Sequence, residues 1–120
     1  MTPEDKRRSE RVIPFVSDEE VVVIRSDGSV PALAKMMDLS ETGTLVYLLP
    51  DGEVAGGIGS AYSLAVYHQG KVFEIPAIVA RKDAHMIAFN FANPSAEVMR
   101  DVQGKLIRME IEWMRLSRKF

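Results

Sequence analysis

The feature that most constrains the fold is a succession of short β-type segments, most of which are joined by short returns. Within residues 12–92, six apolar or alternating stretches are separated by turn signals. The stretches are EVVVIRS, VPALAKMMDLS, TLVYLLP, AYSLAVYH, KVFEIPAIVARK and HMIAFNF. Returns as short as Asp27-Gly28 or Gln69-Gly70 join antiparallel neighbours, because parallel strands need a long crossover. The sequence therefore predicts a mainly β protein, an antiparallel barrel or closed sandwich that leaves few exposed edges.

The C-terminal part of the chain changes to a helical pattern. Asn93 is a candidate cap and Pro94 suits the first helical position, so we expect a helix over residues 94–118. Apolar residues at intervals of three and four form one stripe along it: Val98, Val102, Leu106, Met109, Trp113, Leu116 and Phe120. Such a helix is ~37 Å long at 1.5 Å per residue, which exceeds a small barrel. Either it bends at Gly104 and caps the barrel, or its distal half docks on an effector or on a second copy as a homodimer.

Composition excludes several classes of function. The chain has 120 residues, the size of one domain spanning residues 1–120, and a net charge of −2 argues against a nucleic-acid-binding protein. The absence of cysteine excludes zinc fingers and thiol catalysis. His68 and His85 stand without a carboxylate cluster, and no nucleophile–base spacing is present, so we predict no metal site and no enzyme. The charged N-terminus and the lack of a long apolar run predict a cytoplasmic protein without a membrane span.

A polar stretch between two of the strands, DLSETG, is richer in chemistry than a turn requires. In a strand, Asp38 and Ser40 would face the same side while Leu39 points into the core. Gly43 would permit a positive φ and allow a ligand to approach the backbone closely. A simpler interpretation is that Asp38 and Ser40 only make side-chain turns to backbone amides.

A second motif lies near the N-terminus. The stretch RRSER places Arg7 and Arg11 in an Arg-x-x-x-Arg spacing, with Arg8 between them. The simpler interpretation is a solvated tail, because acidic residues nearly balance the basic ones in this segment.

Together, the Arg-x-x-x-Arg arm and the later Asp-x-Ser-x-x-Gly stretch resemble the paired motifs of the PilZ domain family. The resemblance covers essentially the whole chain and implies one domain: a flexible arm (1–11), a six-stranded antiparallel β-barrel (12–92) and a C-terminal α-helix (93–118). It also implies that the chain binds the bacterial second messenger cyclic di-GMP and needs no further cofactor. The ligand-binding residues that it implies are Arg7, Arg8, Arg11, Asp38, Ser40, Gly43 and Arg81.

These residue types suit the ligand. The planar fork of an arginine engages guanine O6 and N7 or phosphate oxygens with two hydrogen bonds. A carboxylate such as Asp38 accepts well from the N1–H and N2–H₂ donors on guanine's other edge. We therefore expect the arm to fold over a ligand on the outer face of the barrel.

Three functions remain open. The first is a cyclic di-GMP receptor that signals to an unidentified effector protein in motility, pilus, chemotaxis or exopolysaccharide control. The second is a PilZ-fold interaction adaptor that does not bind nucleotide. The third is an anion- or nucleic-acid-binding barrel, which the acidic net charge disfavours.

Overall fold

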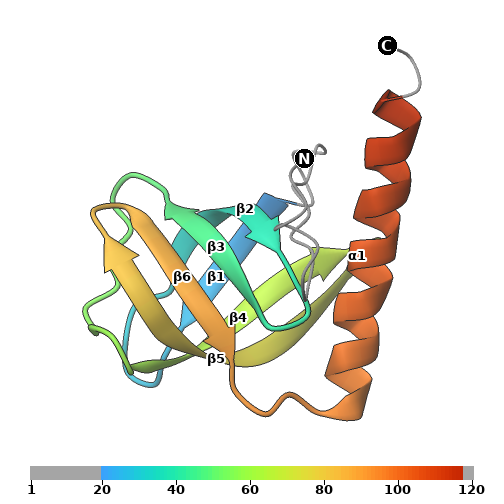
Figure 1. Ribbon diagram of the computed structural model, residues 1–120. Helices are drawn as coiled ribbons and strands as arrows, with labels where there is room; N and C mark the ends of the chain where they lie inside the picture. Colours follow the sequence, from blue (N-terminus) through green and yellow to red (C-terminus); the bar gives the residue numbers. More distant parts are fainter. Residues whose placement is uncertain (1–19, 118–120) are drawn as a thin grey trace.

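The computed structural model describes residues 20–117, and over that range six antiparallel strands close into a barrel that is followed by one helix (Figure 1). The elements are β1 (Val21–Arg25), β2 (Ala32–Leu39), β3 (Gly43–Leu48), β4 (Ala61–His68), β5 (Lys71–Asp83), β6 (Met86–Phe91) and α1 (Ala96–Ser117). Around the barrel the strands run β1-β2-β3-β6-β5-β4, and β4 pairs with β1 to close it. The predicted mainly β fold with a C-terminal helix is confirmed, and the architecture is a barrel rather than a sandwich.

The core follows from the two-residue period of the strands. On β2, Ala34 and Met36 are fully buried while the residues between and before them are exposed. On β5, the inward residues Phe73, Ile75 and Val79 alternate with exposed neighbours in the same way. Since successive side chains of a strand point to opposite faces, one set fills the barrel and the other forms its outer surface.

The helix begins later than its sequence suggests. Asn93 has a positive φ of 47°, so it lies in a turn rather than at a helix cap, and the expected start at Pro94 is wrong. The hydroxyl of Ser95 accepts a hydrogen bond from the Val98 amide at 3.2 Å, and the Ser95 carbonyl accepts from the Met99 amide at 2.9 Å. Ser95 is therefore the N-cap, because it satisfies an amide that the first turn leaves without an intrahelical partner.

The helix does not bend at Gly104. It continues to Ser117, and a Cβ added at Gly104 would lie 3.4 Å from Nε2 of His68, so the helix packs closely on the end of β4 there. Val102 and Met109 are buried on this side, and the buried ammonium of Lys105 donates to the Tyr67 carbonyl. The distal half of α1 extends beyond the strands (Figure 1). Over residues 20–117, no helix combines the length and apolar character needed to cross a membrane.

Candidate functional site

Asp38 stands at a β-bulge near the end of β2. The register between β2 and β3 passes from Met36 opposite Val46 to Asp38 opposite Leu45, so Met37 is an extra residue. The Oδ1 atom of Asp38 accepts a hydrogen bond from the Leu45 amide at 3.1 Å. Because a bulge locally disrupts the backbone ladder, this carboxylate supplies an acceptor for a β3 amide beside the irregularity. The side chain is nevertheless only partly buried.

Ser40 holds the corner between β2 and β3 from within. It is fully buried, and its hydroxyl accepts from the amides of Thr42 at 3.3 Å and Gly43 at 3.2 Å. Its own amide donates to the Gly43 carbonyl at 2.9 Å. The expectation that Ser40 faces outward beside Asp38 is wrong, because β2 ends at Leu39 and the turn directs the next side chain inward. The hydroxyl thus makes the contacts to backbone amides that the simpler interpretation describes.

Gly43 is required for a reason other than the one expected. Over residues 20–117 the glycines with positive φ are Gly28, Gly59 and Gly70, so the expectation of a positive φ at Gly43 is wrong. A Cβ at Gly43 would instead lie 2.2 Å from the carbonyl oxygen of Phe89 on β6. The neighbouring strand β6 therefore approaches this backbone closely.

A row of four residues crosses the outer face of β2, β3, β6 and β5. Asp38 is opposite Leu45, Leu45 is opposite Ala88, and Ala88 is opposite Arg81. Directly opposite residues of antiparallel strands place their side chains on the same face. Leu45 and Ala88 are partly buried and Arg81 is exposed, so this face is the outer one. We call these four residues the outer row.

Bulges place both charged ends of the outer row. The register between β5 and β6 passes from Val79 opposite Phe89 to Arg81 opposite Ala88, which makes Ala80 an extra residue. Without this insertion Ala80 would stand opposite Ala88, and Arg81 would not belong to the row. Bulges commonly redirect a side chain in this way beside binding sites.

The outer row suits a flat, polar-edged ligand. Its ends are three strand spacings apart, about 14 Å at 4.8 Å per spacing. Between a carboxylate acceptor and a guanidinium lies an apolar floor made by Leu45 and Ala88. An aromatic base can lie on such a floor, present its donors to Asp38 and leave an anionic group near Arg81.

The structure tests the grouping of only some of the residues implied by the resemblance. Arg7, Arg8 and Arg11 lie outside the described residues and stay predictions. Asp38, Ser40 and Gly43 share one corner, and Arg81 is joined to Asp38 along the outer row. Sequence reasoning missed Leu45 and Ala88; alternation assigns them to the outer face, but only the bulged register places them between two charges.

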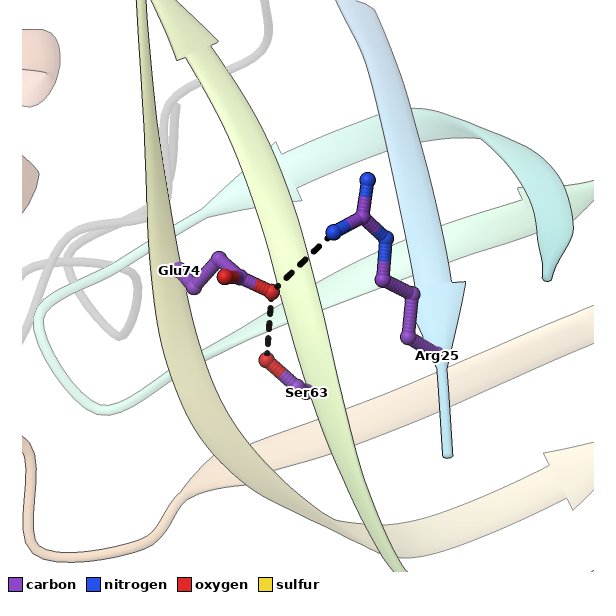
Figure 2. Close-up of polar contacts among 3 residues, drawn as sticks. All are labelled: Arg25, Ser63 and Glu74. Carbon is purple, nitrogen blue, oxygen red and sulfur yellow. Dashed lines mark hydrogen bonds and ion pairs between the residues drawn. The ribbon is translucent and has the colours of Figure 1, made fainter. Parts of the chain in front are cut away.

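A second pair of opposite charges lies on the adjoining outer face, over β1, β4 and β5 (Figure 2). Nη1 of Arg25 is 3.5 Å from Oε1 of Glu74, and the same oxygen accepts from the Ser63 hydroxyl at 3.1 Å. Both charged side chains are about half exposed, at 52% and 53%. The group is a cross-strand surface pair, which typically contributes ~0–1 kcal/mol to stability.

No protein-family model and no curated protein sequence matches the chain. Solved structures do: the PilZ domain of YcgR from Escherichia coli with c-di-GMP has a TM-score of 0.78 and 18% identity, covering 96% of this chain and 99% of that one. The YcgR crystal structure in complex with c-di-GMP has a TM-score of 0.70 and 20% identity, covering 95% of this chain and 50% of that one.

The PilZ domain of CeSA from a cellulose-synthesizing bacterium has a TM-score of 0.60 and 21% identity, covering 80% of this chain and 97% of that one. All three neighbours are PilZ domains or contain one. The fold of this chain is thus the PilZ fold, as the two motifs imply.

Proposed function

We propose that this protein is a receptor for cyclic di-GMP, which it binds on the outer face of β2, β3, β6 and β5. The observation that carries the proposal is the outer row, in which Asp38 and Arg81 stand at opposite ends of the apolar pair Leu45 and Ala88. The PilZ fold supports the same assignment, because two of the structural neighbours are described with c-di-GMP. The Arg-x-x-x-Arg motif, which resembles that of the PilZ family, supports it as well.

The proposed recognition divides the ligand between two surfaces. On the barrel, Asp38 accepts from the N1–H and N2–H₂ donors of one guanine, which lies over Leu45. Its Oδ1 atom already accepts from the Leu45 amide, and this contact fixes the direction of the carboxylate. Arg81 contributes a cation toward the phosphodiester groups.

The N-terminal arm supplies the opposite surface. Arg7 and Arg11 engage guanine or phosphate through paired hydrogen bonds, with Arg8 as a further contact. Ordering of residues 1–11 over the ligand creates a new surface of arm and nucleotide beside the barrel. In this proposal a separate effector protein in the cytoplasm recognises that surface. The proposed receptor has no catalytic role and needs no cofactor.

A nucleotide-free adaptor is the second candidate, and one observation favours it. Asp38 and Ser40 both use side-chain oxygens to hold the backbone of their own corner. A corner with a purely structural role would need the same contacts.

Calorimetry with the full chain separates the candidates. We expect saturable binding of cyclic di-GMP, with no comparable binding of GTP, cyclic GMP or single-stranded DNA. Binding of none of the four would favour the adaptor and overturn the receptor. Preference for single-stranded DNA would show a general polyanion-binding barrel instead.

A further inference from the structure

The side of α1 that faces away from the barrel carries a second apolar stripe. Ile107, Ile111 and Met114 are spaced four and three residues apart, so they share one face of the helix. Ile111 follows Val102 by about 2.5 turns at 3.6 residues per turn, and it therefore points opposite to the buried side. The exposed fractions of Ile107, Ile111 and Met114 are 58%, 41% and 51%. We call these three residues the outer stripe.

The outer stripe differs from the stripe predicted from the sequence. Val102, Leu106 and Met109 belong to the predicted stripe and are buried against the barrel. The barrel covers this part of the predicted stripe but leaves Trp113, a later member of it, 47% exposed, and it leaves the outer stripe uncovered. Spacings of four and three correspond to the a and d positions of a heptad, the seam of a two-stranded coiled coil.

Charged residues beside the outer stripe indicate what covers it. Glu110 and Arg115, both exposed, occupy the g and e positions on its two sides. In a parallel pair of helices, a g residue meets the e residue five positions later on the partner. Glu110 of each copy then faces Arg115 of the other, which gives two attractive contacts.

An antiparallel pair would bring like charges together. If Ile107 of one copy packed on Ile111 of the other, the e positions would place Arg108 against Arg108, and the g positions Glu110 against Glu110. We therefore propose that the outer stripe is the interface of a parallel homodimer of this chain. This proposal concerns the helix alone and does not depend on the proposed function.

The geometry allows the two copies to meet without collision. Each barrel packs on the helix face opposite the outer stripe, so a two-fold axis parallel to the helices leaves both barrels on the outside. Three partly exposed side chains per copy bury less than the ~1,000 Å² that a stable interface needs. The dimer is accordingly weak and forms at high protein concentration.

Sedimentation measurements up to ~1 mM protein test the association. We expect a concentration-dependent monomer–dimer equilibrium that Ile111→Glu weakens by at least about tenfold, because it buries two carboxylates at the seam. Leu33→Glu is the matched control, since Leu33 is 50% exposed on β2 and should leave the equilibrium unchanged. A monomer at all concentrations, or equal loss in both variants, would overturn the proposal.

Cross-linking tests the orientation without a disruptive substitution. The chain contains no cysteine, so Met114→Cys introduces a unique thiol. In a parallel pair the two introduced thiols are adjacent and should form an intermolecular disulfide under mild oxidation. In the antiparallel pair, residue 114 packs opposite residue 104, ~15 Å along the helix from the other thiol. Failure to cross-link under conditions where the protein sediments as a dimer would exclude the parallel arrangement.

A charge exchange tests the flanking contacts. Glu110→Arg should weaken the dimer severalfold because it faces Arg115 of the second copy, and adding Arg115→Glu should restore it. A double variant as weak as the single one would contradict the parallel pairing.

Discussion

Two neighbouring parts of the barrel surface hold opposite charges in different ways. Over β1, β4 and β5, Arg25 and Glu74 are 3.5 Å apart and Ser63 donates to the same carboxylate oxygen (Figure 2). Over β2, β3, β6 and β5, Asp38 and Arg81 are separated by two further strands with apolar side chains between them.

The separation determines what each surface is able to do. Charges in direct contact neutralise one another, and an exposed pair of this kind adds little to stability. Charges held about 14 Å apart, at 4.8 Å per strand spacing, leave room for a ligand that is polar at its edges and apolar in the middle. Neither pair of charges is therefore expected to add much stability, and only the outer row leaves room for the proposed ligand.

The largest expected effect removes the strand contact on which the outer row depends. Gly43→Ala places a Cβ 2.2 Å from the Phe89 carbonyl oxygen, a backbone atom that cannot move without parting β3 from β6. We expect a loss of about 2–5 kcal/mol in the free energy of unfolding, measured by urea denaturation.

Gly57→Ala is the control for this change, because no atom lies within 4 Å of the added Cβ and φ is not positive. Similar losses in the two variants would show that the close approach of β3 and β6 is not what Gly43 provides.

The arm is expected to have the next largest effect, on affinity rather than on stability. Arg7→Ala or Arg11→Ala should weaken cyclic di-GMP binding by ~1–3 kcal/mol per lost bidentate contact. Arg→Lys should not restore it, since an ammonium group cannot reproduce the planar fork. Calorimetry checks this, and full affinity in either lysine variant would remove the assigned role.

Asp38→Asn sharpens the comparison at the carboxylate end of the row. Asparagine keeps an oxygen that can accept from the Leu45 amide, so the corner should remain folded. The selectivity for cyclic di-GMP over cyclic di-AMP should fall by about tenfold or more, because the donor edge of guanine then faces the NH₂ group of the asparagine.

Glu74→Gln is the matched control, a carboxylate-to-amide change on the other surface. We expect it to leave the selectivity unchanged. If Asp38→Asn discriminates between the two dinucleotides as well as the parent does, Asp38 has only its backbone role.

The smallest effects are expected from Arg81 and Arg25, the exposed arginines of the two surfaces compared. Arg81→Ala should lower cyclic di-GMP affinity by about 1 kcal/mol, the contribution of a solvent-exposed charged contact, and leave stability unchanged. Arg25→Ala should leave affinity unchanged and lower stability by no more than ~1 kcal/mol, because it removes only a surface pair. If the two variants bind cyclic di-GMP with equal affinity, Arg81 does not contribute to the proposed binding.

The local sequence pattern alone predicted the strands, the helix and two of the turns of this protein. Strand alternation and short returns predicted six antiparallel strands, and the three-and-four spacing near the C-terminus predicted a helix. Positive φ angles occur at Gly28 and Gly70, where turn dipeptides were recognised. These features depend on neighbouring residues only, and so a sequence reveals them directly.

The arrangement of the candidate site depends on contacts between residues that are far apart in the sequence. Two bulges set which residues share the outer row, and a bulge depends on the register with the partner strand rather than on its own sequence. The need for Gly43 arises from Phe89, far along the chain. Likewise, α1 continues past Gly104, and the packing of the barrel against one side of it buries Val102 and Met109 while Ile107 and Ile111 stay exposed.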